Sequence, residues 1–448
     1  MSLLHNIKLT CLNTTTMVKK ILNIKDENIT FPANALSEEN IHGVTAKVFS
    51  GLLSYPVNPQ SCPNCGVIGS IIKHSAYPSL IQLLPFQIVP TYLRLFKQRY
   101  CCKACKHTFS ARTDIVDENC SLANALKFAI LEDLKHKIAM TDIANRYFVS
   151  PKTVERILKT YSYYVNPNRF QLPVCLLIDE FKGTKDCNGK MCFIFSDAQT
   201  GKIIDILDDR RNFTITNYFL RFSLANRSCV KFIVMDMNAA YPHAIKRLFP
   251  NAEIVIDHFH IVQQMSRAMN QKRIQVMKAL RYKNSRAYNK LKRYWKLLLM
   301  SENQLNYEKR VQYPLFDQKY LTQTEVVDTL LSFDNQLSRC YQIYQSLLTC
   351  FHQKQAKEFF YMLQTLPKDL DQPFKKSLMY LIEHTHPIKN ALQQPYSNGK
   401  LEGKNHLIKV FQRVAFGFRN FENMRRRIFL YEESWHTKQP QKRSQKAA

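Results

Sequence analysis

The stretches VCLLIDE (174–180) and KFIVMDMN (231–238) decide the fold that this sequence predicts. Each is a short apolar run that ends in an acid, Asp179 in the first and Asp236 in the second. A short apolar run bounded by polar residues is typical of a buried strand. In α/β sheets, sites are built outside the carboxyl ends of the strands. We therefore expect Asp179 and Asp236 to belong to one site rather than to cap two unrelated strands.

Further strands are predicted between and after these two. MCFIFSDAQTGKIIDILDD (191–209) has two apolar runs around a turn, and EIVIDHFH (253–260) ends its apolar run in Asp257. The predicted order is a strand carrying Asp179, two more strands, a helix, and a strand carrying Asp236. This order is the layout of an RNase H-like fold, which belongs to the α/β class.

Acids that share a cleft predict a metal site. Two carboxylates repel each other unless a cation lies between them, and Mg²⁺ takes oxygen ligands. Pairs of such ions, about 3.5–4 Å apart, support phosphoryl transfer. A third acid is then expected, and the candidate is Glu402. It stands near the start of a predicted helix, after a helix-breaking Asn-Gly pair, in YSNGKLEGKNHLIKVFQRVAFGFRN (396–420). The alternative third acid is Glu383.

Two cysteine pairs predict a structural zinc site. SCPNCG (61–66) and CCKACKHTF (101–109) each contain a C-x-x-C turn. Each such turn supplies two thiolates, and zinc requires four ligands at tetrahedral corners. The expected ligands are Cys62, Cys65, Cys102 and Cys105. Cys101 leaves an ambiguity, because it could replace Cys102 with poorer geometry.

A helix-turn-helix is predicted over TDIANRYFVSPKTVERIL (141–158). Ser150 suits the N-cap of the second helix, and Pro151 suits its first position. In a helix-turn-helix the second helix enters the major groove with its N-terminal side chains toward the bases. A helical hairpin that only packs against its neighbours is the alternative interpretation.

The charge balance favours a polyanionic partner. The 448 residues include 64 Lys and Arg against 35 Asp and Glu, a formal net charge of +29. Such an excess attracts nucleic acid. The most apolar region (79–96) is interrupted by Pro85 and Pro90, so it does not predict a membrane span. The N-terminus has no secretory signal pattern, and 13 mostly scattered cysteines suit a reducing cytosol.

Two basic segments are expected to contact phosphates. Residues 258–301 contain eleven Lys or Arg and no acid, and a second basic run follows at 425–427. Aromatic residues are interleaved in the first segment, and we expect core positions for them rather than base stacking; they are Tyr282, Tyr288, Tyr294 and Trp295. The residues expected to contact DNA are Lys152, Thr153, Arg156, Arg273, Arg281, Arg293, Arg413, Arg419, Arg425 and Arg426.

The combination of these motifs resembles insertion-sequence DDE transposases of the ISL-three family. The shared pieces are CPNC, CKAC, the helix-turn-helix, LIDE, VMDMN, IDHFH and SNGKLEGKNHLIKVFQRVAFGFRNFENMRRR. The resemblance implies that Asp179, Asp236 and Glu402 form a catalytic triad that binds two Mg²⁺ or Mn²⁺ ions. It also implies a multimer that pairs two DNA ends. Asp257, His258 and His260 match the family's acid-aromatic-histidine stretch without an assigned role.

These observations predict a multidomain transposase. It would bind the terminal inverted repeats of an element, cleave the ends and join the freed 3′-hydroxyls to target DNA in the bacterial cytoplasm, in association with the nucleoid. A catalytically inactive DNA-binding regulator and an RNase H-like nuclease are the alternatives. The predicted parts are a leader (1–45, with Met17 as another possible start), a zinc-finger β domain (46–112), a helix-turn-helix domain (113–165), an RNase H-like core (166–262 and 394–437), a helical insertion (263–393) and a basic tail (438–448).

Overall fold

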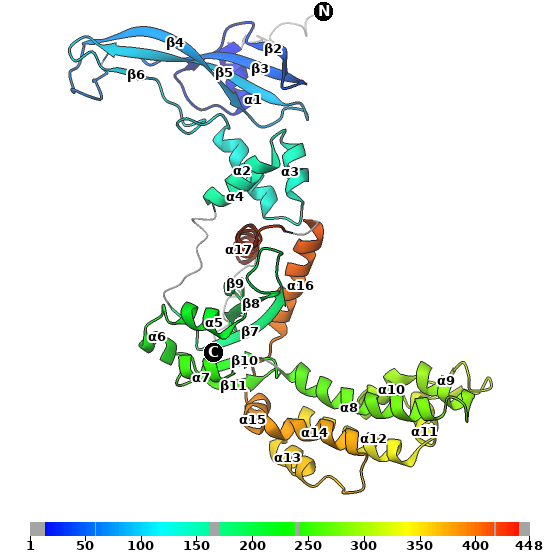
Figure 1. Ribbon diagram of the computed structural model, residues 1–448. Helices are drawn as coiled ribbons and strands as arrows, with labels where there is room; N and C mark the ends of the chain where they lie inside the picture. Colours follow the sequence, from blue (N-terminus) through cyan, green and yellow to red (C-terminus); the bar gives the residue numbers. More distant parts are fainter. Residues whose placement is uncertain (1–13, 59, 162–170, 238–241, 416–417, 439–448) are drawn as a thin grey trace, which may run out of the picture. The chain divides into compact units, whose positions relative to one another are not determined.

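The computed structural model describes residues 14–58, 60–161, 171–237, 242–415 and 418–438 (Figure 1). The chain forms two compact units. Unit 1 contains residues 1–166, 410–418 and 422–448, and unit 2 contains residues 167–409 and 419–421. Most of the predicted basic tail and residues 1–13 of the predicted leader lie outside the described residues.

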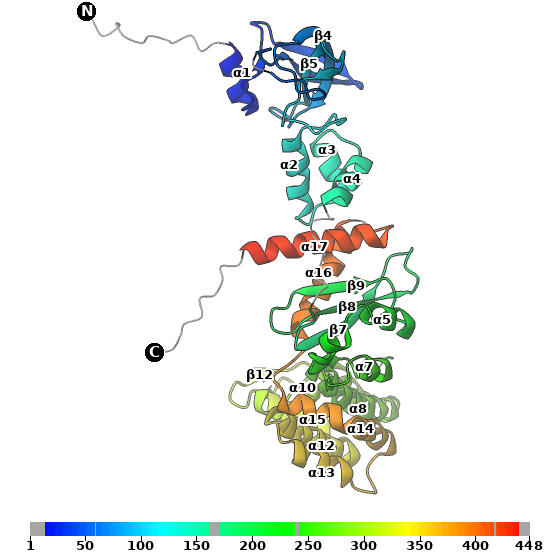
Figure 2. The same cartoon turned by 90° about the vertical axis from the view of Figure 1, so that its left-hand side faces the viewer.

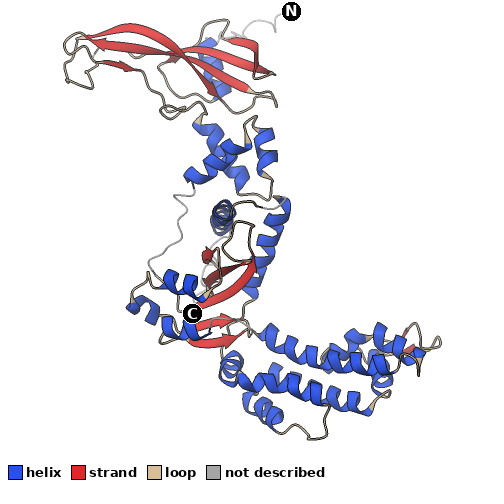
Figure 3. Cartoon of the chain, in the orientation of Figure 1, coloured by secondary structure: helices blue, strands red, loops and turns tan. Residues whose placement is uncertain are grey.

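Unit 1 contains a six-stranded sheet with the order β1-β3-β5-β4, in which β2 pairs with β3 and β6 with β5 (Figure 3). The central pair β3–β5 is parallel, and the other pairs are antiparallel. Along β5, buried Leu93 and Leu95 alternate with outward-facing Tyr92 and Arg94, which is the period of a half-buried strand. The strands are β1 (Ile29–Thr30), β2 (Leu36–Ile41), β3 (Val44–Leu53), β4 (Ile71–Gln82), β5 (Thr91–Cys102) and β6 (Thr108–Ser110).

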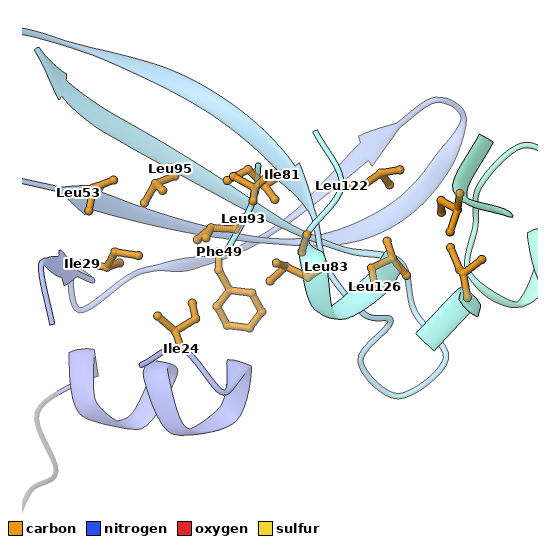
Figure 4. Packing of buried hydrophobic residues seen from close by; sticks show 14 of the residues in the cluster. Ile24, Ile29, Phe49, Leu53, Ile81, Leu83, Leu93, Leu95, Leu122 and Leu126 are labelled. Carbon is orange, nitrogen blue, oxygen red and sulfur yellow. The ribbon is translucent and has the colours of Figure 1, made fainter. Parts of the chain in front are cut away.

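The segment expected to be a leader is part of this sheet from residue 14 onward. It forms α1 (Thr14–Leu22) and the strands β1 and β2, and Ile29 of β1 pairs with Leu53 of β3. Figure 4 shows Ile24 and Ile29 packed near Phe49 and Leu53 under the sheet. The structure therefore extends the domain predicted over 46–112 back to residue 14.

Three helices follow the sheet in unit 1. They are α2 (Asn124–Leu134), α3 (Met140–Arg146) and α4 (Pro151–Tyr161) (Figure 2). The hydroxyl of Ser150 accepts a hydrogen bond from the backbone N–H of Thr153 at 3.1 Å, so Ser150 caps α4 as the sequence predicts. Ile143 of α3 and Val154 and Leu158 of α4 are fully buried.

Unit 2 is built on a five-stranded sheet with the order β11-β10-β7-β8-β9. The pairs β7–β10 and β10–β11 are parallel, and β7–β8 and β8–β9 are antiparallel. The predicted order of strands and helix is confirmed. The elements are β7 (Cys175–Lys182), β8 (Met191–Asp197), β9 (Ile203–Leu207), α5 (Asn212–Phe219), α6 (Leu224–Ser228), β10 (Phe232–Met235), α7 (Pro242–Leu248) and β11 (Glu253–Ile256).

Helices cover the sheet, so its central strands are apolar on both faces. In Figures 1 and 2, α5 and α16 (Gly399–Val414) flank the sheet from opposite sides. Leu176, Leu177 and Ile178 of β7 are consecutive and fully buried, as in strands covered on both faces. Asp179 is therefore the first half-exposed residue of a buried strand.

A largely helical segment, predicted as an insertion over 263–393, separates β11 from α16. The first helix, α8, leads away from the sheet, and α15 returns beside β11, where Asn390 donates to the carbonyl of Ile254 at 3.0 Å (Figure 1). No helix among the described residues is long and apolar enough to span a bilayer. The helices are α8 (His258–Ala279), α9 (Ser285–Arg293), α10 (Trp295–Leu299), η1 (Glu302–Gln304), α11 (Gln323–Leu331), α12 (Asn335–His352), α13 (Ala356–Gln364), α14 (Gln372–Glu383) and α15 (Thr385–Gln393), with a small hairpin of β12 (Val311–Gln312) and β13 (Tyr320–Leu321).

The last helix, α17 (Phe421–Lys438), belongs to unit 1 from residue 422 onward. The sequence predicts this helix as part of the core, in the segment 394–437. The structure instead divides this segment between the two units, because Arg427 and Leu430 of α17 contact the helices of unit 1.

Candidate functional site

Three aspartates stand side by side at one edge of the unit 2 sheet. The parallel register pairs Leu177 of β7 with Val234 of β10, and Val234 with Val255 of β11. In each strand the acid follows two residues after this paired position, at the edge where sites of α/β sheets are built. The strands β10 and β11 end before their acids, whereas β7 continues past Asp179 to Lys182. The acids are Asp179, Asp236 and Asp257. The sheet register therefore aligns the two predicted acids and adds Asp257 to them.

Glu402 joins this edge from the first turn of α16. The helix starts where the buried Asn398 binds two strand ends: its backbone N–H donates to Asp257 Oδ1 at 3.0 Å, and its amide donates to the carbonyl of Ile178 at 3.4 Å. The backbone N–H of Glu402 donates to the carbonyl of Asn398 at 2.9 Å. Glu383, the alternative third acid, is exposed at the end of α14 and lies outside the described acid cluster.

Neighbouring side chains hold two of the aspartates in place. Asn405, which is 6% exposed, donates from its amide to Asp179 Oδ2 at 2.7 Å. His260 Nε2 lies 2.5 Å from Asp236 Oδ1. Asp179 Oδ1 also accepts from the backbone N–H of Glu180 at 2.7 Å. These contacts fix the carboxylates toward the shared edge instead of leaving them to rotate in solvent.

Burial and mutual repulsion raise the pKa values of two acids of the cluster. Burial raises the pKa of Asp179 to about 6, and the negative charges of Asp236 and Glu402 add to the increase. Partial desolvation also raises the pKa of Glu402, which remains exposed, and the charge of Asp257 adds to the increase. The hydrogen bond to Asp236 raises the pKa of His260, which favours the charged imidazolium as a local partner. A divalent cation would remove the same repulsion.

The donor set fits a divalent cation. The ligand atoms of Asp257, His260 and Glu402 all lie within 4.8 Å of one another. Carboxylate oxygens are the ligands that Mg²⁺ and Mn²⁺ prefer, and imidazole nitrogen is also a ligand for transition metals. Among the described residues, this group is not the predicted triad itself. Asp236 contacts it through His260, and Asp179 interacts with Glu402 through its charge.

Several residues of the site were not assigned from the sequence. Asn405 lies three positions after Glu402, a helical spacing that places both side chains on one face and could have indicated it. Asp257 carries the same signal as the two predicted aspartates, an acid at the end of an apolar run. His258, by contrast, turns its ring nitrogen to the carbonyl of Ala391 on α15 at 2.6 Å, so it serves packing.

The four predicted zinc ligands converge in unit 1. The sulfur atoms of Cys62 and Cys105 lie 3.6 Å apart, and those of Cys65 and Cys102 lie 3.7 Å apart. Tetrahedral zinc with bonds of about 2.3 Å needs sulfurs about 3.8 Å apart, so the residues fit the ion. Hydrogen bonds from the backbone of His107 and the amide of Asn64 lower the pKa of Cys105 to about 6, which favours the thiolate.

Cys101 is not part of this cluster. Its sulfur lies near the carbonyls of Cys102 and Lys106, at 3.7 and 4.0 Å. Successive side chains of β5 point to opposite faces of the strand. The alternation therefore resolves the ambiguity in favour of Cys102 as the ligand.

The residues expected to contact DNA differ in their exposure. Thr153 is half-buried, and six of these residues are exposed: Lys152 and Arg156 of α4, Arg281, Arg293, Arg413 and Arg419. Arg425 and Arg426 are partly buried and both approach Glu422, at 3.6 and 3.7 Å. Arg273 is 6% exposed, and its guanidinium donates to the carbonyl of Leu291 at 3.0 Å inside the insertion. This burial removes Arg273 from the expected DNA contacts.

The aromatic residues of the acid-free segment are not core residues, contrary to expectation. Tyr282 is 90% exposed and Trp295 is 37% exposed. Tyr288 and Tyr294 are partly exposed. Tyr294 packs edge-on against Tyr313 at a ring-centroid distance of 5.6 Å, in a small cluster beside α9.

Two family models match parts of this chain. Residues 176–428 match a DDE family model of the ISL3 type, described as Transposase. Residues 58–105 match a model described as zinc-finger of transposase IS204/IS1001/IS1096/IS1165. The chain is also similar to a protein of Lactococcus lactis subsp. lactis named ATP-dependent protease, with 40% identity over 111 residues. That match covers 25% of this chain and 36% of the relative.

Proposed function

Because this chain belongs to the ISL3 transposase family, we propose that it moves an insertion sequence. It would bind the terminal inverted repeats, cleave the element ends and transfer the 3′-hydroxyl strands into target DNA. The observation that carries this proposal is the convergence of acids in unit 2. Asp179, Asp236 and Asp257 stand at one level of three parallel strands, and Glu402 approaches them from α16.

The fold supports this assignment through its layout. In our proposal the sheet of unit 2 is an RNase H-like core interrupted by the helical insertion. The helices α3 and α4 act as a helix-turn-helix, and the cysteine cluster holds one structural zinc ion. Lys152, Thr153 and Arg156 on α4 would contact the repeats, because α4 presents its N-terminal residues beside the capped turn.

The residues of the site have distinct roles in the proposed reaction. Asp179, Asp236 and Glu402 would hold two Mg²⁺ or Mn²⁺ ions, with Asp257 beside them. The chemistry supplied by bound ions is activation of an attacking water or hydroxyl and stabilisation of the departing 3′-oxygen. Asn405 orients the carboxylate of Asp179, and His260 orients that of Asp236. No protein nucleophile is required for this chemistry.

Exposed basic residues outside α4 would form the rest of the protein surface that contacts DNA. Four exposed arginines would contact phosphates in this proposal, namely Arg281 and Arg293 of the insertion, and Arg413 and Arg419 after Glu402. Pairing of two element ends by a homo-oligomer follows from the family and is part of the proposal. The proposed location is the bacterial cytoplasm, where the DNA is.

A joining assay with Asp179→Asn tests the function. The substrates are labelled duplexes from both ends of the genomic segment that carries this coding sequence, with a supercoiled target plasmid. The wild type should bind the duplexes and join them to the plasmid in Mg²⁺ or Mn²⁺, whereas Asp179→Asn should bind without joining. Cleavage without joining by the wild type would favour a nuclease. Binding without either reaction by both proteins would favour a regulator.

The protease name of the similar Lactococcus lactis protein is not extended to this chain. The similarity covers about a third of that protein. In addition, the ten glycines of this sequence do not form a G-x-x-x-x-G-K-S/T loop, the usual phosphate-binding motif of ATPases.

A further inference from the structure

One arginine of α17, Arg427, is buried. Arg427 is 1% exposed, although it belongs to the run Arg425–Arg427 that the sequence suggested for DNA phosphates. Its guanidinium donates to the backbone carbonyls of Leu134 at 3.3 Å and of His136 at 3.0 Å, and also to that of Ile138. The side chain is buried inside unit 1, so it cannot contact DNA.

The three acceptors occupy a particular place in the fold. Leu134 is the last residue of α2, and His136 and Ile138 belong to the short link that leads to α3. The last carbonyls of a helix have no partner within the helix, and a cation suits that end of the helix dipole. Arg427 therefore satisfies the end of α2 and fixes the link that sets the direction of α3. Burial lowers the pKa of Arg427 to about 10, so it remains charged at neutral pH.

A second contact reaches the helix proposed to read DNA. Asn423, 9% exposed and one helical turn before Arg427, donates from its amide to Glu155 Oε1 at 3.0 Å. Glu155 lies on α4 and also accepts from Lys152 at 2.8 Å and pairs with Lys159 at 3.0 Å. Asn423 thus holds Glu155, the acid that pairs with Lys152 and Lys159 on α4.

Apolar packing supports the same docking. Leu430, one turn after Arg427, is 3% exposed and belongs to the core cluster that contains Ile130 of α2, Ile143 of α3 and Val154 of α4. Polar contacts at Asn423 and Arg427 and an apolar contact at Leu430 recur along one face of α17, at the spacing of a helix. Figure 2 shows α17 beside α2 and α4.

From these contacts we infer that α17 is an integral helix of the DNA-reading unit, and that Arg427 and Asn423 are positioning residues for recognition of the element ends. The inference rests on the proposed function. It means that the unit that reads DNA is assembled from two parts of the chain, one before and one after the carboxylate site. Removal of the C-terminal part would then impair recognition without touching any acid of that site.

The test compares full-length variants in two assays. Arg427→Gln removes most of the donors, whereas Arg427→Lys keeps a cation with three donors. Asn423→Ala removes the contact to Glu155 of α4, together with the 3.5 Å hydrogen bond that Asn423 accepts from Arg426. The control is Arg112→Gln, an exposed arginine of unit 1 paired with Glu118 on the surface. The first assay is fluorescence anisotropy on an end duplex and on a scrambled duplex. The second is metal-dependent nicking of supercoiled DNA without element ends.

Arg427→Gln should weaken binding to the end duplex by about tenfold or more, the usual effect of leaving buried acceptors unpaired. Binding to the scrambled duplex and nicking should stay near the wild-type level. Arg427→Lys should recover part of the loss, and Asn423→Ala should lose about threefold. The inference is overturned if Arg427→Gln and Asn423→Ala discriminate the two duplexes as well as Arg112→Gln does. If Arg427→Gln fails to fold, Arg427→Lys and Asn423→Ala decide the matter by the same criterion. Failure of the wild type itself to distinguish the duplexes or to nick DNA would instead contradict the proposed function.

Discussion

The contact between Asn405 and Asp179 allows the carboxylate site to be perturbed without removing an acid. The amide donates to the carboxylate at 2.7 Å, and Asn405 is 6% exposed. A hydrogen bond to a charged acceptor contributes about 1.5–3 kcal/mol. If this contact holds Asp179 in its reactive position, Asn405→Ala should slow metal-dependent cleavage about tenfold to a hundredfold, because 1.4 kcal/mol corresponds to a factor of about ten.

The assay is nicking of a supercoiled plasmid over a range of Mn²⁺ concentrations. We expect the midpoint of the Mn²⁺ titration to rise in Asn405→Ala, since Asp179 loses the donor that lowers its pKa and binds a proton more readily. The matched control is His406→Ala, the next residue of α16, whose side chain is exposed. Equal rates and equal midpoints for the two variants would refute the positioning role of Asn405.

Two further predictions concern unit 1. First, elemental analysis should find one zinc ion per chain. Cys105→Ser should lower both the zinc content and the unfolding temperature. Cys101→Ser is the control and should change neither, because Cys101 is outside the cluster. Acid should destabilise unit 1 through Glu155, whose bonds to Lys152, Asn423 and Lys159 lower its pKa to about 2 from the ordinary 4.5. A lowered folded-state pKa gives stability that is present above pH 4.5 and lost as the pH falls toward 2. Urea unfolding at pH 5 and at pH 3 should therefore show a smaller loss of stability in Glu155→Gln than in the wild type; an identical loss would contradict the role of Glu155.

Features with a local pattern could be predicted from the sequence. The apolar runs ending in Asp179 and Asp236 gave the strands and their order, and Ser150 marked the start of α4. The paired C-x-x-C turns gave four cysteines that converge. Each of these features is defined by neighbouring residues in the sequence. The side-chain period of a strand or helix then determines which of those residues share a face.

Features that depend on distant contacts could not be predicted in this way. Arg427 binds a carbonyl 293 residues before it in the chain, and the sequence shows only a run of three arginines. In the sequence, Arg273 does not differ from the other basic residues of the acid-free segment 258–301. Its burial depends on its contact with Leu291 of α9. The register that places Asp257 beside Asp236 is set by the pairing of β10 with β11. Sequence periodicity does not encode which element covers a side chain.

Direct measurement of metal binding tests the central claim, that acids from three strands and one helix share divalent ions. Mn²⁺ binding can be followed by electron paramagnetic resonance in the wild type and in Glu402→Gln, with Glu383→Gln as the control acid. We predict that the wild type and Glu383→Gln take up Mn²⁺ alike and that Glu402→Gln binds it at least about tenfold more weakly, as expected for loss of a carboxylate ligand. Unchanged Mn²⁺ affinity in Glu402→Gln would contradict the account.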